Sequence, residues 1–188
     1  LNQITEKSLV WIVSQSGNSV EIVLLLDHLR KIKPACILGT TNNPEGKLAQ
    51  ACDLVLPISA GDEFTVSTKT FTNTLALDQL AATQLLGGKI GAAIAEFEAL
   101  ASSLEEYLSD FDGKLEELRS QIGTSFEHAI LVGRGASMAT VMGGSLILKE
   151  ASKTILEGMS TSHFRHGPME LVEPGFSLYL LAGQSPTR

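Results

Sequence analysis

The residues best suited to chemistry stand in the polar segment Ser14–Ser19, which contains three serines, a glutamine, an asparagine and a glycine. An apolar run, Leu9–Val13, precedes this segment, and an amphipathic stretch, Val20–Ile32, follows it. A strand, a glycine-containing loop and a helix in this order are typical of anion sites, because backbone N–H groups converge at the helix start and the helix dipole favours negative charge. The segment has no Lys or Arg and lacks the Gly-x-x-x-x-Gly-Lys-Ser/Thr motif of nucleotide loops. We therefore expect a hydrogen-bonding site for one phosphate group.

A second candidate is Glu150, which lies late in a predicted helix, Met138–Ala151. A carboxylate partly withdrawn from water takes up a proton more readily and becomes usable as a general base near neutral pH. The apolar neighbours Leu146 and Ile147 favour such partial burial. The alternative is an exposed helix glutamate beside Lys149, with no catalytic role.

Two histidines, His163 and His166, lie three residues apart and precede Gly167-Pro168. They could ligate a metal as a pair, but no third ligand stands at a suitable spacing, so we expect no metal site. A single general acid or base at His166 is the stronger hypothesis, because Gly167-Pro168 would fix its backbone. A surface histidine without a function is the alternative.

The elements that would position the phosphate site follow from the hydrophobic pattern. Leu9–Val13 predicts a buried strand, and the spacing of three and four between the apolar residues of Val20–Ile32 predicts a helix. Further strands are predicted at Ala35–Leu38 and Leu54–Ile58, with a short helix near Lys47–Ala51 between them. The order βαβαβ with short links predicts a parallel sheet with right-handed crossovers. Ligands of such sheets bind beyond the carboxyl ends of the strands.

More polar residues are predicted at that edge of the sheet. A loop at Thr40–Asn43 would lie at the same edge as Ser14–Ser19. Asn18 with Glu21 fits a capping box at the start of the first helix. Ser-Thr-Lys at 67–69 opens a helix that runs to about residue 86. These hydroxyls are either N-cap residues or a second wall of the phosphate site.

The middle of the chain carries an apolar stripe with alternating spacings of three and four, from Ile90 to Ile122. It predicts two helices, interrupted near Asp110–Gly113, that pack on the sheets or on a partner chain. The acidic pairs within this stretch are interpreted as a solvated face.

A second strand–glycine loop–helix unit begins after His128. A strand at Ala129–Val132 and a glycine-rich loop lead into the helix Met138–Ala151, and further strands are predicted at Ile155–Met159 and Phe176–Ala182. A polar loop is predicted at residues 184–188. The two units resemble complementary parts of one repeated design, so we expect an α/β protein with parallel sheets in two incomplete copies.

The amino-acid composition of the chain excludes several classes of function. The net charge of −7 argues against general nucleic-acid binding, which needs a basic face. No apolar run of about 18 residues occurs, so we expect no membrane span. The two cysteines, Cys36 and Cys52, lack the Cys-x-x-Cys spacing and are interpreted as reduced thiols of a cytoplasmic protein.

Five motifs carry a resemblance to a known family. They are, in chain order, Ser14-Gln15-Ser16-Gly17-Asn18-Ser19, Ser67-Thr68-Lys69-Thr70-Phe71-Thr72, Gly133-Arg134-Gly135, Leu148-Lys149-Glu150 and Phe164-Arg165-His166-Gly167-Pro168. In this order they resemble the tandem sugar-isomerase (SIS) domains of glucosamine-6-phosphate synthases and their stand-alone relatives. The resemblance implies three-layer αβα units: the C-terminal part of a first SIS domain at 1–86, linking helices at 87–125, and the N-terminal part of a second SIS domain at 126–188.

The resemblance also implies a role for each matching residue. The phosphate of a fructose 6-phosphate or glucosamine 6-phosphate type of ligand would be bound by Ser14, Gln15, Ser16 and Ser19, with Val66 and Ser67 lining the same pocket. Glu150 would move the proton between C1 and C2 in aldose–ketose isomerisation. His166 would assist ring opening from the neighbouring subunit of a homodimer. No cofactor is implied.

The chain departs from the synthase pattern at Ile147, where the synthase has a lysine three residues before its catalytic glutamate. Neither a glutaminase domain nor the synthase's C-terminal lysine tail is present in these 188 residues. These departures favour a stand-alone phosphosugar isomerase, or an enzyme that removes an amine from an amino-sugar phosphate. The alternative from another class is a non-catalytic SIS module that senses sugar phosphates for a regulator.

Overall fold

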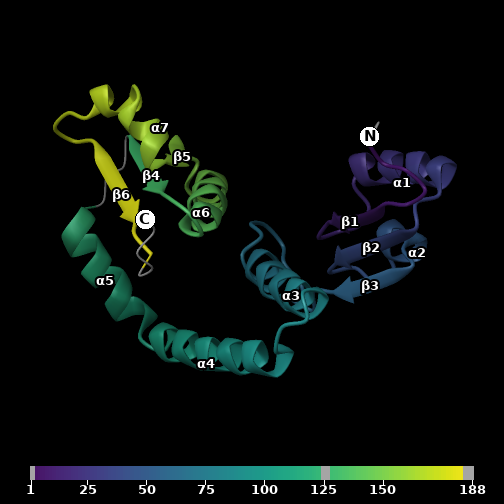
Figure 1. Ribbon diagram of the computed structural model, residues 1–188. Coiled ribbons are helices and arrows are strands. Elements are labelled where there is room, and N and C mark those ends of the chain that lie inside the picture. Colours follow the sequence, from purple (N-terminus) through teal and green to yellow (C-terminus); the bar gives the residue numbers. More distant parts are fainter. Residues whose placement is uncertain (1–2, 124–127, 184–188) are drawn as a thin grey trace. The chain divides into compact units, whose positions relative to one another are not determined.

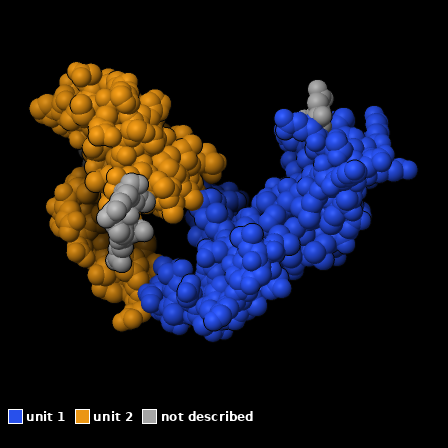
Figure 2. All heavy atoms as spheres, in the orientation of Figure 1, with its two compact units in different colours: residues 1–104 blue, residues 105–188 orange. Residues whose placement is uncertain are grey.

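The computed structural model describes residues 3–123 and 128–183, so the polar loop predicted at 184–188 lies outside the described residues. The chain divides into two compact units, residues 1–104 and residues 105–188 (Figure 2). Each unit contains one parallel sheet, and each is described by itself.

The first unit contains the predicted βαβαβ arrangement. Its elements are β1 (Leu9–Val13), α1 (Val20–Ile32), β2 (Cys36–Thr41), α2 (Lys47–Ala51) and β3 (Leu54–Pro57). The three strands are parallel in the order β1-β2-β3 (Figure 1), which confirms the predicted parallel sheet. The helices α3 (Lys69–Leu85) and α4 (Ile90–Leu108) follow.

The core of the first unit lies between one face of the sheet and the helices α1 and α2. Leu29 and Leu48 are fully buried there, together with Ile12 and Leu26. The three- and four-residue spacing of the apolar positions of α1 places them on this face, as a 3.6-residue turn requires.

Strand β2 is longer than the sequence predicts. Thr40 and Thr41 were expected in a loop, yet both belong to the strand and are fully buried. Their side chains satisfy their hydrogen bonds inside the protein: the Thr41 hydroxyl donates to the backbone oxygen of Gln15, and the Thr40 hydroxyl donates to Asp78. Partnered hydroxyls can be buried at little cost, so these contacts outweigh the turn preference of the local sequence.

The second unit contains a second parallel sheet, in the order β5-β4-β6. Its elements are α5 (Phe111–Ile122), β4 (Ala129–Gly133), α6 (Ser137–Ser152), β5 (Leu156–Ser160), α7 (Thr161–Arg165), the 3₁₀ helix η1 (Pro168–Leu171) and β6 (Ser177–Leu181). Every residue of the central strand β4 is buried. Leu131 and Val141 pack on one face of the sheet, whereas Val132 and Phe164 pack on the other. The fold is α/β with parallel sheets, as predicted.

The apolar stripe of the middle segment forms two helices, α4 and α5, and the break between them lies at residues 109–110. Neither helix has a buried residue. The predicted packing of these helices on the sheets is therefore wrong, because their apolar side chains, such as Leu104 and Phe111, stay exposed. Packing on a partner chain stays a prediction.

We predict that Leu29→Ala destabilises the first unit by about 2–5 kcal/mol, because removing a fully buried leucine side chain leaves a cavity. Urea unfolding followed by circular dichroism measures the loss. Leu24→Ala is the matched control, because Leu24 lies on the same helix with 64% of its surface exposed. Equal losses in the two variants would contradict the assigned core.

Candidate functional site

The loop Ser14–Ser19 joins the carboxyl end of β1 to the start of α1, and its entry is held by the end of β2. The Ser14 N–H donates to the backbone oxygen of Thr40 at 2.9 Å. The backbone oxygen of Gln15 accepts from the Asn42 N–H at 3.0 Å and from the Thr41 hydroxyl at 3.1 Å. These three bonds fix the direction in which the chain leaves the sheet.

The middle of the loop is held by the segment before α2 and by its first turn. The Leu48 N–H donates to the Gly17 oxygen at 3.0 Å, and the Asn43 side-chain amide donates to the Ser16 oxygen at 3.1 Å. Gly17 is buried and has a φ of +62°, whereas Ser16 is exposed. The turn of the loop therefore faces the protein, while serine side chains stay open to a ligand.

The three serine hydroxyls each accept a backbone N–H of the loop or of α1. Ser14 Oγ accepts from Gly17 at 3.2 Å, Ser16 Oγ from Asn18 at 3.3 Å, and Ser19 Oγ from Ile22 at 3.4 Å. A hydroxyl that accepts a bond in this way still has its own proton to donate. The loop thus orients three O–H groups, as binding of an anionic oxygen requires.

The predicted capping box is wrong at its first residue. Ser19, not Asn18, is the N-cap of α1, with extended backbone angles and a side chain that accepts from Ile22. The Asn18 side-chain oxygen instead accepts the Lys47 N–H at 2.9 Å, so a tertiary contact with α2 withdraws it from the helix. Glu21 does lie in the first turn, where hydrogen bonds from its own N–H and from the Ser19 hydroxyl lower the pKa of its carboxyl.

The second predicted wall, Val66 and Ser67, lies just before α3, after the segment that leaves β3. Val66 is half-buried and Ser67 is exposed. Both follow a strand of the same parallel sheet as the Ser14–Ser19 loop, so both approach the carboxyl edge of that sheet. Asn42 links the loop to the segment after β3. Its backbone N–H donates to the Gln15 oxygen, its side-chain N–H₂ donates to the Gly61 oxygen at 2.9 Å, and its side-chain oxygen accepts from the Ala60 N–H.

One of the hydroxyl residues of 67–69, Thr68, is the N-cap of α3, as predicted, but Glu63 supplies the capping hydrogen bonds. The Thr68 N-cap position makes no side-chain capping bond. The Glu63 carboxylate accepts the N–H groups of Thr68, Lys69 and Thr70, together with the Thr70 hydroxyl. The bond from the Thr70 hydroxyl, with help from the three backbone bonds and against partial desolvation, lowers the pKa of Glu63 to about 2. In the sequence, this cap is indicated by an acidic residue that stands a few positions before the Ser-Thr pair at the start of the helix.

Glu150 lies near the end of α6 and is exposed, so the predicted partial burial is wrong. Helix geometry gives the reason. Val141 and Ser145, four residues apart, are the buried residues of α6, and five residues beyond Ser145 the helix has turned away from that face. The Glu150 backbone oxygen accepts from Lys153 Nζ at 2.6 Å.

His166 is the C-cap of α7, and its N–H donates to the His163 oxygen at 2.9 Å. The next residue, Gly167, has a φ of +140°. Both histidine side chains are exposed. Within residues 3–123 and 128–183, no three His, Cys, Asp or Glu side chains form a group that could hold a metal ion.

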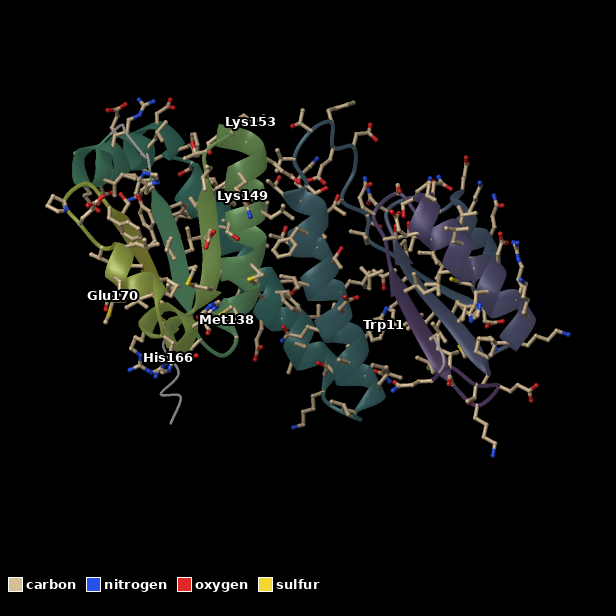
Figure 3. All side chains as sticks on the ribbon, turned by 90° about the horizontal axis from the view of Figure 1, so that it is seen from above. Trp11, Met138, Lys149, Lys153, His166 and Glu170 are labelled. Carbon is tan, nitrogen blue, oxygen red and sulfur yellow. The ribbon has the colours of Figure 1, made fainter. Side chains whose placement is uncertain are left out.

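Glu150 and His166 lie at opposite ends of the second unit. Helix α6 runs back from the carboxyl edge of the sheet, so Glu150 stands near the amino edge, whereas α7 and His166 follow the carboxyl end of β5. Figure 3 shows Lys149, the neighbour of Glu150, toward one end of α6, and His166 beyond the other end, near Met138. One unit therefore does not bring these two residues together.

A cavity of about 470 Å³ opens at the amino edge of the second sheet, and its lining includes His128, Glu157 and Phe176. None of the predicted site residues lines this cavity. In the described part of the chain, no helix combines the length and apolar character that crossing a bilayer would require.

Residues 1–84, which include the Ser14–Ser19 loop and most of α3, match the family model described as the SIS domain. This part of the chain is therefore similar to the SIS domain family. The match includes the loop, the three-stranded sheet and the turn at Val66 and Ser67, so these residues form one SIS-type edge.

Sequence relatives cover both units. The glutamine–fructose-6-phosphate aminotransferase (isomerizing) of Rhizobium leguminosarum bv. viciae is 29% identical over 189 residues, which cover 95% of this chain and 30% of the relative. The chain thus spans about a third of the length of the curated relatives it matches.

Solved structures agree with this arrangement of the fold. The C-terminal domain of the glucosamine-fructose-6-phosphate aminotransferase from Francisella tularensis has a TM-score of 0.77 at 26% identity, over 92% of this chain and 50% of that one. The tagatose-6-phosphate ketose/aldose isomerase from Escherichia coli has a TM-score of 0.76 at 20% identity, over 98% and 51%. The second of these likenesses concerns the fold alone.

We predict that Gly17→Ala strains the phosphate loop. An added Cβ would lie 3.1 Å from both Leu48 Cβ and Thr41 Oγ1, at a left-handed φ that alone costs about 1–2 kcal/mol for a residue with a side chain. Gly87→Ala is the matched control, because Gly87 has a similar φ of +71° with nothing within 4 Å of its added Cβ. Urea unfolding should show the larger loss for Gly17→Ala, and an equal loss would contradict the close packing of the loop.

We predict that Glu63→Gln removes a pH-dependent part of the stability. The folded pKa of about 2 lies below the ordinary 4.5, so the carboxylate stabilises the folded state above about pH 4.5 and loses this effect as the pH falls toward 2. Thermal melts at neutral pH and at pH 3 should therefore show a smaller difference between the wild type and Glu63→Gln at the acid pH. Asp62→Asn is the control, because Asp62 contacts Lys69 through its backbone oxygen. A difference independent of pH would contradict the cap.

Proposed function

We propose that this protein binds the 6-phosphate of a hexose or hexosamine and catalyses aldose–ketose isomerisation of that sugar. The observation that carries the proposal is the Ser14–Ser19 loop, whose three hydroxyls are oriented at the start of a helix on the carboxyl edge of a parallel sheet. The match of residues 1–84 to the SIS domain model supports it. The similarity of the whole chain to isomerising aminotransferases supports the reaction class.

Phosphate binding is assigned to Ser14, Gln15, Ser16 and Ser19, with Val66 and Ser67 beside them. Neutral donors at a helix N-terminus suit one phosphate dianion, because the aligned peptide dipoles and the hydrogen bonds both act on it. The Ser19 hydroxyl bonds with Glu21 in this structure, so a bound phosphate would compete with that carboxylate for the Ser19 proton.

The chemistry is assigned to Glu150 and His166. His166 would give a proton to the ring oxygen as the bond between that oxygen and the anomeric carbon breaks. The anomeric hydroxyl loses its proton in the same step and becomes the free carbonyl, which opens the sugar. Glu150 would then remove the proton from C2 of the aldose while the carbonyl oxygen on C1 takes up a proton, which forms an enediol. Return of a proton to C1, with loss of the proton on the C2 hydroxyl, gives the ketose.

The positions of Glu150 and His166 favour a homodimer. The two residues lie at opposite ends of the second unit, so one site that contains both would take Glu150 from one copy and His166 from another. A more specific version of this proposal is that the enzyme also transfers or removes an amine at C1 or C2 of the sugar. The isomerising aminotransferases among the relatives support it, whereas Ile147 in place of the synthase lysine favours plain isomerisation.

A second candidate function is a sugar-phosphate sensor without turnover. The exposure of Glu150 favours it, because a catalytic base works best in a site that excludes water, and Glu150 lies open to solvent in this structure. The two candidates differ in one measurable property, which is turnover of a ligand that both would bind.

We predict that Glu150→Gln lowers the turnover of fructose 6-phosphate or glucosamine 6-phosphate by about 10²–10⁴-fold, because it removes the proton-transfer group but keeps the shape of the side chain. Coupled assays measure turnover, and calorimetry should show an unchanged dissociation constant for the substrate. Glu157→Gln, an exposed glutamate on β5, is the control and should keep wild-type turnover.

Unchanged turnover in Glu150→Gln would exclude Glu150 as the base. Binding by the wild-type protein without any turnover would instead favour the sensor.

A further inference from the structure

A chain of two hydrogen bonds crosses the face of the first sheet that is opposite α1 and α2. The Trp11 indole Nε1 on β1 donates to Thr40 Oγ1 on β2 at 2.9 Å, and Thr40 Oγ1 donates to Asp78 Oδ1 on α3 at 3.3 Å. Thr40 is fully buried, whereas Trp11 and Asp78 are half-buried. Figure 3 shows Trp11 on β1. None of the three residues has a part in the proposed binding or chemistry.

The direction of these bonds is fixed by the groups themselves. An indole N–H can only donate, and an ionised carboxylate can only accept. Thr40 must therefore use its oxygen toward Trp11 and its proton toward Asp78. Burial raises the pKa of Asp78, and the bond from Thr40 opposes that rise. The Asp78 carboxylate can be half-buried despite the free-energy cost of its lost hydration, because the Thr40 hydroxyl donates a hydrogen bond to it.

Thr40 links this chain to the phosphate loop through its backbone. Its carbonyl oxygen accepts the N–H of Ser14, the first residue of the loop, at 2.9 Å. One buried residue thus holds the start of the loop with its main chain and α3 with its side chain. A second bond between α3 and the segment after β3, from the Asn73 side chain to the Ile58 oxygen, is longer at 3.5 Å.

The position of α3 decides where Val66 and Ser67 lie. Asp78 shares one face of α3 with the buried Thr70, two turns nearer the helix start. Nine residues separate Asp78 from Lys69, which is about 13 Å along a helix axis. Because a helix is stiff over that length, fixing Asp78 against Thr40 fixes the distance between the start of α3 and the phosphate loop.

We propose that Thr40 and Asp78 are positioning residues that hold the Ser67 wall at the distance from the Ser14–Ser19 loop that a hexose 6-phosphate requires. This inference rests on the proposed function. A phosphate ion alone needs only the loop, whereas a sugar phosphate needs both the loop and the wall.

The test compares two ligands, inorganic phosphate and fructose 6-phosphate, by calorimetry on the purified protein. Asp78→Ala should weaken fructose 6-phosphate binding about tenfold, as loss of a hydrogen bond that orders a site does, and should change phosphate binding by less than about twofold. Thr40→Val should act in the same way. Asp78→Asn keeps an acceptor oxygen and Thr40→Ser keeps the hydroxyl, so both should bind the two ligands like the wild type.

The single tryptophan gives a second readout, since no other indole contributes to the fluorescence. Thr40→Val should shift the Trp11 emission, because the indole loses its acceptor, while Thr40→Ser should leave it unchanged. This measurement needs no ligand and also shows whether each variant is folded.

If the wild type binds both ligands, and Asp78→Ala and Thr40→Val bind them with the same affinities as the wild type, the inference is overturned and the proposed function stands. Equal weakening of both ligands would also overturn it, because that result indicates a general loss of structure. If the wild type binds neither ligand, the proposed function fails and the inference fails with it.

Discussion

The hydrogen bonds between the end of β2 and the loop after β1 are the constraint on which the first unit depends. A buried strand end with unpartnered polar groups would be costly, and here the Thr41 hydroxyl, the Asn42 N–H and the Thr40 oxygen all find partners in Ser14 and Gln15. The same bonds give the polar loop one conformation. Stability of the sheet and orientation of the serine hydroxyls therefore have a common cause.

The sheet order and the helices of the first unit could be predicted from the sequence, because they depend on hydrophobic periodicity within short segments. Strand β1 and the helices α1 and α2 have the predicted bounds, and the parallel order follows from the short βαβ links. The SIS domain assignment could also be predicted, since its loop and turn motifs are local. Each of these signals is a short local pattern, and their order along the chain adds the rest of the information.

The errors share a different origin, which is contact between segments distant in the sequence. Asn18 has the right side chain for an N-cap, but Lys47 on another helix binds it. Thr40 was expected in a loop because its partner, Asp78, is 38 residues away. The exposure of Glu150 depends on which face of α6 meets β4 and β5, and helix periodicity in a segment of small and apolar residues does not specify that face. The roles of the site residues stay predictions.

The glutamate cap of α3 has a consequence for which sugars the first unit can accept. Three helices, α1, α2 and α3, begin at the carboxyl edge of its sheet, and the N-terminus of α3 is already neutralised by Glu63. A substrate with two phosphates would find a fixed negative charge where its second phosphate could otherwise bind. On the proposed function, the chain would therefore discriminate against sugar bisphosphates by repulsion from its own side chain, without a separate selectivity element.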